Sequence, residues 1–172
     1  MGTRNLVMVT SKGKIKVAQY GQWDGYPTGQ GAVIAKFLQD ELDLRKFKKH
    51  VDALEFADSK FIESTWKDCG ADDSGFVTFE IGDLHGIIYP EFSRDTGAEI
   101  LGLIQTGLFP LAQNEIEFLE EGLYCEYAYD INLDKKTVTI YTGGKKKYTE
   151  LKFKDFTVDK MKQIESEMNK QS

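Results

Sequence analysis

Alternating apolar and polar residues near the start of the chain predict a β-hairpin. Residues 4–10 (RNLVMVT) and 14–20 (KIKVAQY) are short runs with many β-branched residues, and residues 11–13 (SKG) form a turn signal between them. Ile15 and Val17 fall on one face of the second run and its lysines on the other, which indicates a sheet with one solvated face.

The next stretch changes from a two-residue period to the helical period. Apolar residues recur at helical spacing in two groups, separated by a break near residues 40–43: Val33, Ile34, Phe37 and Leu38, then Leu44, Phe47, Val51 and Leu54. These groups predict a pair of helices. Phe61, Ile62 and Trp66 indicate a further short helix that ends at Cys69-Gly70.

The middle of the chain gives weaker signals. Residues 71–75 (ADDSG) indicate a loop, and residues 76–81 (FVTFEI) alternate as a strand does. Thr96 and Glu99 have the spacing of a capping box at the start of a helix. Gly107 is a suitable stop for that helix.

Hairpin signals return in the last third. Residues 123–133 and 137–142 are apolar and aromatic runs around a turn, and residues 148–153 supply a third strand. Apolar residues from Val158 to Met168 then recur at the spacing of an amphipathic helix. We therefore expect one α+β domain over residues 1–172. Its antiparallel sheet of about five strands combines the N-terminal hairpin with a three-stranded meander and packs with several helices.

Composition narrows the classes of function. The chain has 172 residues, a net charge of −6 and two cysteines. An acidic balance argues against binding of extended nucleic acid, which needs clustered Lys and Arg. No apolar run is long enough to cross a bilayer, and the first residues do not resemble a signal peptide. With only two cysteines, a disulfide framework is not expected, so we expect a cytoplasmic protein.

Two histidines limit the metal chemistry that the chain can support. His50 and His85 cannot form a three-histidine site. Glu80, Asp83 and His85 lie close together but lack the i, i+4 spacing of a zinc protease helix. We interpret these three residues as a polar loop after a strand, and no metal site is expected.

Nucleophilic catalysis also lacks a clear signal. There is no Gly-x-Ser-x-Gly motif, and Cys125 lies in an apolar run, where cysteine is usually an inert core residue. Removal of Met1 would expose Gly2, which has no side chain to attack with. We assign no catalytic residue and no cofactor, and the question of enzymatic activity stays open.

Residues 18–31 (AQYGQWDGYPTGQG) are the strongest candidate for a site. Their aromatic rings and side-chain amides suit a small ligand. Glycines before a helix allow backbone N–H groups to face an anion. Arg94, just ahead of another helix, has a planar guanidinium that can bind a phosphate or carboxylate through two hydrogen bonds. The alternative is that the rings only cover the core. The candidate ligand-binding residues are Arg4, Tyr20, Gln22, Trp23, Asp24, Tyr26, Arg94 and Thr96.

The chain resembles a family of small bacteriophage and bacterial proteins that has no assigned activity. The resemblance rests on residues 2–6 (GTRNL), 17–31 (VAQYGQWDGYPTGQG), 93–98 (SRDTGA) and 123–129 (LYCEYAY). It implies a phage setting, in which small acidic proteins blunt host immunity by binding nucleotide-derived signals or by occupying a host protein.

Three functions follow from these observations. The leading expectation is a protein in the host cytoplasm that binds a small anionic, nucleotide-like ligand and sequesters an immune signal. The first alternative is a protein-binding inhibitor of a host factor with an acidic surface and an aromatic loop. The second alternative is a nucleotide hydrolase that uses Asp24, His85 or Glu80. Sheet edges and exposed aromatics would also allow a homodimer.

Overall fold

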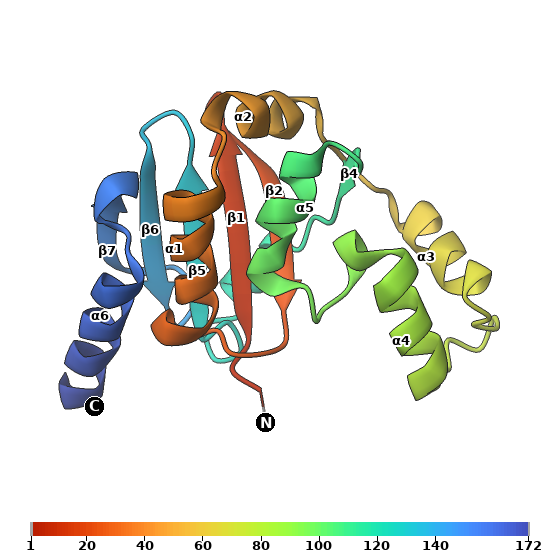
Figure 1. Ribbon diagram of the computed structural model, residues 1–172. Coiled ribbons are helices and arrows are strands. Elements are labelled where there is room, and N and C mark those ends of the chain that lie inside the picture. The colour runs from red at the N-terminus through yellow and green to blue at the C-terminus, as the bar shows by residue number, and fades with distance from the viewer. Residues whose placement is uncertain (1, 172) are drawn as a thin grey trace.

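A five-stranded sheet forms the centre of the protein, whose computed structural model describes residues 2–171 (Figure 1). The strand order is β2-β1-β5-β6-β7, and the β1–β2, β5–β6 and β6–β7 pairs are antiparallel. The strands are β1 Asn5–Ser11, β2 Lys14–Gly21, β5 Tyr127–Asn132, β6 Thr137–Thr142 and β7 Lys146–Lys152. The predicted α+β class, the hairpin and the meander are confirmed.

One parallel pair departs from the expected antiparallel sheet. Strands β1 and β5 run side by side in the same direction, with Leu6 opposite Ala128 and Val9 opposite Ile131. This pair joins the N-terminal hairpin to the C-terminal meander, so the sheet is mixed. All seven residues of β1 are buried, as expected for a strand with neighbours on both sides and cover on both faces.

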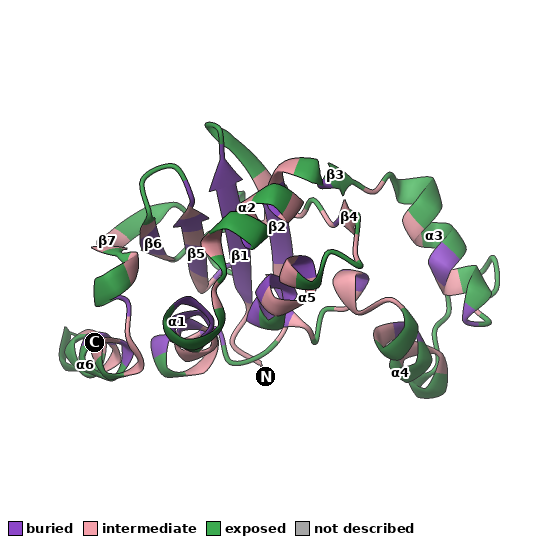
Figure 2. Cartoon of the chain, turned by 45° about the horizontal axis from the view of Figure 1, so that its top comes forward, coloured by how far each residue is buried: buried purple, intermediate pink, exposed green. Residues whose placement is uncertain are grey.

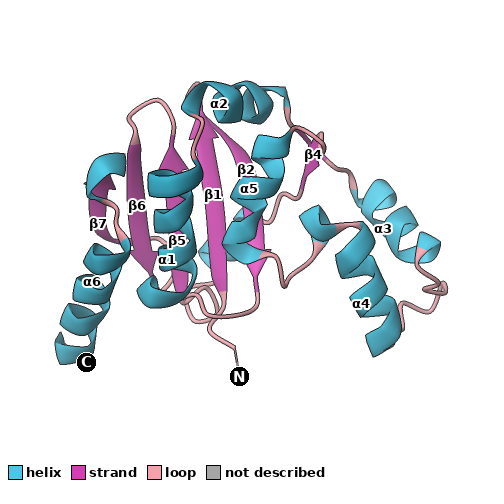
Figure 3. Cartoon of the chain, viewed as in Figure 1, coloured by secondary structure: helices cyan, strands magenta, loops and turns pink. Residues whose placement is uncertain are grey.

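Four helices cover one face of the sheet (Figure 3). Buried side chains from all four pack on the same core as the strands, including Ile34, Phe47, Leu101 and Met161. The helices are α1 Ala32–Lys36, α2 Leu44–Ala53, α5 Ile100–Thr106 and α6 Val158–Gln171. The predicted helix pair and the C-terminal helix are therefore confirmed. Two π-helical turns, Pro27–Gly31 and Phe37–Glu41, flank α1.

The opposite face of the sheet has a smaller core. Leu6, Met8 and Ala128 pack there against Leu119 and Cys125. A short 3-10 turn, Ile116–Glu120, carries Leu119 and lies in the segment that covers this face. Residues 116–125, in the chain between α5 and β5, therefore cover that side of the sheet.

Two further helices form an arm that projects beyond β2 (Figure 1). The arm consists of α3 Ser59–Asp68, the following loop, and α4 Phe79–Ile88. A two-stranded parallel sheet of β3 Glu55–Phe56 and β4 Leu111–Ala112 lies near its base. Many side chains of the arm are exposed (Figure 2).

The predicted strand over residues 76–81 is wrong. Residues 76–78 are irregular and α4 begins at Phe79. Thr78 is its N-cap, and the Thr78 hydroxyl accepts a hydrogen bond from the backbone N–H of Ile81 at 3.3 Å. The alternation in residues 76–81 is too short to distinguish a strand from the start of a helix, and the capping preference of Thr78 favours the helix. Asp83 and His85 lie on this helix and not in a loop.

Two other local predictions also need correction. Thr96 has helical backbone angles and makes no capping contact with Glu99; its hydroxyl donates to the carbonyl of Pro90 at 2.5 Å. The strand expected over residues 123–133 begins only at Tyr127, because the chain turns tightly before it. Gly107 does end α5, with the left-handed φ of 76° that glycine permits.

Candidate functional site

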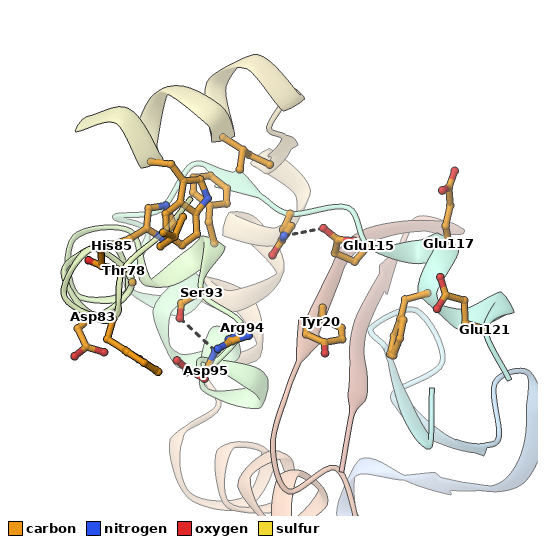
Figure 4. A pocket seen from close by; sticks show the side chains of 18 residues that line it. Tyr20, Thr78, Asp83, His85, Ser93, Arg94, Asp95, Glu115, Glu117 and Glu121 are labelled. Atoms are coloured by element: carbon orange, nitrogen blue, oxygen red, sulfur yellow. Dashed lines mark hydrogen bonds between the residues drawn. The ribbon is translucent and has the colours of Figure 1, made fainter. Parts of the chain in front are cut away.

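A cleft of about 730 Å³ lies between the edge of β2 and the α3–α4 arm (Figure 4). It is lined by Tyr20 of β2, by residues of both arm helices, and by two irregular segments, residues 92–95 and 113–121. Its volume is within the range of ligand-binding sites in proteins. The cleft is therefore the candidate site of this fold.

Backbone hydrogen bonds fix both irregular segments to the edge of β2. The backbone N–H of Glu115 donates to the carbonyl of Ala18 at 2.9 Å, and the N–H of Gln22 donates to the carbonyl of Arg94 at 2.9 Å. The side chain of Gln19 adds a bond from Nε2 to the carbonyl of Ser93 at 3.1 Å. Tyr20 therefore lies between two segments that the strand itself holds in place.

Aromatic rings form much of the cleft wall. Tyr20 meets Phe118 edge to face, with ring centroids 4.9 Å apart. On the arm side, Trp66 stacks on His85 at 3.6 Å and an interplanar angle of 3°. Phe79 lines the cleft and is 89% exposed. Such rings can pack on apolar groups and on cations.

Carboxylates dominate the charge of the cleft. Asp83, Asp95, Glu115, Glu117 and Glu121 line it, whereas Arg94 is the one cationic side chain in the lining (Figure 4). Within residues 2–171, none of these five carboxylates forms an ion pair. A cleft with one sign of charge concentrates the opposite ion, so this one favours cationic groups.

Hydrogen bonds orient two of the acids. The Gln113 Nε2 donates to Glu115 Oε1 at 2.7 Å, and the Trp23 indole N–H donates to Asp95 Oδ1 at 2.7 Å. Both bonds leave the second carboxylate oxygen without a side-chain donor. The acidic lining is therefore partly fixed in orientation and still able to accept bonds from a ligand.

His85 is a packing group in this site. The Thr65 hydroxyl donates to the carbonyl of Ile62 at 2.6 Å, so it accepts from His85 Nε2–H at 2.9 Å. Burial lowers the pKa of His85 below its ordinary value, because the charged ring would lose its hydration. His85 thus packs between Trp66 and Thr65, with the tautomer that carries its proton on Nε2.

Tyr20 and Arg94 are the predicted site residues that line the cleft. Gln22 and Trp23 lie beside it: Gln22 Oε1 accepts from the Tyr20 hydroxyl at 2.6 Å, and Trp23 bonds to Asp95 as described. The aromatic turn and the segment around Arg94 therefore lie side by side, but Trp23 is not part of the cleft lining.

The other predicted residues lie outside the cleft lining. The Arg4 guanidinium stands 4.8 Å from the centre of the Tyr124 ring, and its backbone N–H donates to Glu126 at 3.2 Å. The Tyr26 hydroxyl donates to Asp24 Oδ1 at 3.0 Å. Thr96 bonds to Pro90. These contacts hold the three side chains to other parts of the chain outside the cleft lining.

The glycines of residues 18–31 serve close packing of the chain. The Gly25 N–H donates to the Thr3 carbonyl at 2.8 Å, and a Cβ at Gly25 would lie 2.9 Å from that oxygen. Gln30 Oε1 accepts from the N–H of Ala98 at 2.7 Å, which ties the segment to the turn before α5. Trp23 remains 47% exposed, so the segment is not a sealed lid on the core.

Several residues of the cleft carry little signal in the sequence. The local pattern places Phe79 in a strand and Asp83 in a polar loop, and it gives no role to the acids at 115, 117 and 121. The run at 115–121 (EIEFLEE) combines acids with an aromatic residue, a signal that could have marked it.

No protein-family model, curated protein or solved structure matches the chain. Within residues 2–171 there is no group of three or more His, Cys, Asp or Glu residues arranged to hold a metal ion. None of the helices in this part of the chain has the length and apolar character needed to cross a membrane. The fold and the cleft therefore carry the functional argument.

Proposed function

We propose that this protein acts by binding another protein at the cleft and along the α3–α4 arm. One observation carries the proposal. Seven of the 13 large hydrophobic side chains that are exposed among residues 2–171 lie between residues 59 and 88, including Phe76, Phe79 and Ile87 at 71%, 89% and 78% exposed. Concentrated apolar exposure of this kind is typical of interaction surfaces.

The charge of the cleft supports the same proposal. An interface needs apolar anchors near its centre and polar groups that set orientation, and the arm and the acidic lining offer these side by side. The resemblance to phage proteins suggests the setting. The proposed partner is a host protein that this chain inhibits by occupying its surface.

Binding of a small anionic, nucleotide-like ligand is the second candidate, and Arg94 beside Tyr20 favours it. Five carboxylates around one arginine work against it, because they repel phosphate. A thermal-shift screen with nucleotides and cyclic nucleotides separates the two. A rise in melting temperature that Arg94→Ala removes would support the anionic ligand.

The protein-binding proposal is tested with matched surface variants. A partner captured from cell lysate is purified and titrated against the wild type, against Phe79→Ser with Ile87→Ser, and against Leu108→Ser. Leu108 is 77% exposed and lies outside the arm, so it serves as the control. We expect the arm variant to weaken binding at least about tenfold, since two anchors are removed, and the control to bind normally. Equal binding by all three proteins would refute the proposal.

A further inference from the structure

The chemistry of the partner can be specified further, and this step rests on the proposed function. We propose that the cleft receives a cationic amphipathic segment of the partner protein. Its Lys or Arg side chains lie among Glu115, Glu117 and Glu121, and its apolar side chains pack on Phe79 and the arm.

The acids on the sheet side of the cleft are available to an incoming cation. Glu117 and Glu121 make no side-chain hydrogen bond and no ion pair within the described residues, and Glu115 accepts only from Gln113. Their neighbour Glu120, which does not line the cleft, is by contrast paired with Lys145. The protein therefore neutralises the acid beside the cleft and leaves those in it uncompensated.

Aromatic rings beside these acids fit the same cation. Tyr20 and Phe118 line the cleft with the glutamates, as Figure 4 shows for Tyr20, Glu115, Glu117 and Glu121. A guanidinium or ammonium group can lie on a ring face while it bonds to a carboxylate. The edge-to-face pair of Tyr20 and Phe118 places both rings in the cleft wall beside the glutamates.

The arm side of the cleft supplies the apolar half of the site. Val77 and Phe79 line it from the start of α4, and both are exposed at 40% and 89%. Asp83 lies one turn further along the same helix and also lines the cleft. A partner segment that is apolar on one side and basic on the other would satisfy both walls.

Arg94 limits where the basic groups of that segment can lie. It lines the cleft near Ser93 and Asp95, and Figure 4 shows it between Asp83 on the arm side and Glu117 and Glu121 on the other side. A cation placed next to it would be repelled, so the charges of the partner belong on the side of Glu117 and Glu121. The cleft therefore discriminates between orientations of a basic segment as well as between charges.

Defined peptides test this inference. A fluorescent 14-residue peptide of Lys and Leu in an amphipathic pattern is titrated against the protein, in parallel with a peptide that carries Glu in place of Lys and one that carries Ser in place of Leu. We expect binding of the Lys/Leu peptide only, and a weaker affinity at higher salt because the charges are partly exposed.

Charge variants locate the bound peptide. Glu117→Gln with Glu121→Gln is compared with Asp159→Asn with Glu167→Gln, which makes the same change in net charge on α6. We expect the cleft variant to weaken binding about three- to tenfold, as two partly exposed ion pairs would, and the α6 variant to have little effect.

Several results would overturn the inference. These are binding of the Glu peptide as tight as that of the Lys peptide, no binding of either, or equal losses in both charge variants, which would mean bulk attraction only. If the purified partner still depends on Phe79 and Ile87 while the Lys/Leu peptide does not bind, the inference fails and the proposed function stands. If the affinity for the partner does not depend on Phe79 and Ile87, the proposed function itself fails.

Discussion

Replacement of Thr65 by valine should loosen the arm while leaving the sheet intact. Thr65 is 1% exposed, and its hydroxyl is the acceptor for His85 Nε2–H at 2.9 Å. Valine has nearly the same shape, so the volume at this buried position is kept, but the buried N–H of His85 loses its partner. Such a loss costs about 1–3 kcal/mol. Hydrogen exchange of arm amides that open locally should therefore accelerate about five- to 150-fold.

Mass-spectrometric hydrogen exchange on peptides from residues 59–88 measures this effect, with peptides from β1 and β5 as internal references. Thr106→Val is the matched control, because the Thr106 hydroxyl also donates to a carbonyl three residues earlier, at 2.6 Å, and has no histidine partner. Unchanged exchange of the arm in Thr65→Val, or the same acceleration in both variants, would refute the role assigned to the His85 bond.

Two more predictions concern pH and the core. The pKa of His85 in the folded protein lies below its ordinary value of 6.5, so the neutral ring stabilises the arm fully above pH 6.5 and less as the pH falls below 6.5. Hydrogen exchange of the arm amides, corrected for the intrinsic exchange rate, should therefore become faster in acid. His85→Gln should remove most of this pH dependence. Tyr129→Phe should lower the free energy of unfolding by about 1–3 kcal/mol in urea denaturation, because the buried hydroxyl donates to the Gly25 carbonyl at 2.7 Å; an unchanged midpoint would contradict this.

Local patterns predicted most of the elements, because their signals lie within a few residues. The hairpin turn at residues 11–13 and the glycine stop at Gly107 are of this kind. The strand prediction for residues 76–81 is wrong because six alternating residues also fit the start of a helix, and the contact that determines the structure is the N-cap hydrogen bond at Thr78. The three-residue spacing between the N-cap hydroxyl of Thr78 and the Ile81 N–H that donates to it competes directly with a two-residue period.

Long-range features had weaker signals in the sequence. The uninterrupted apolar run at residues 6–9 (LVMV) is typical of a strand covered on both faces, yet its parallel partner lies more than a hundred residues away. The candidate site was found in part: Tyr20 and Arg94 line the cleft, and Trp23 bonds to Asp95 at its edge. The acids at 115–121 join it through long-range contacts that no local pattern reveals, such as the backbone bond of Glu115 to Ala18 and the contact of Phe118 with Tyr20.

The parallel contact between β1 and β5 also determines when the protein can fold. β1 is synthesised before its second neighbour, Tyr127–Asn132, which follows it by more than a hundred residues. Until then one edge of the most apolar strand lacks its ladder and is open to pairing with other chains. Closure of such a distant pair is slow, so newly made molecules should need protection from aggregation during translation.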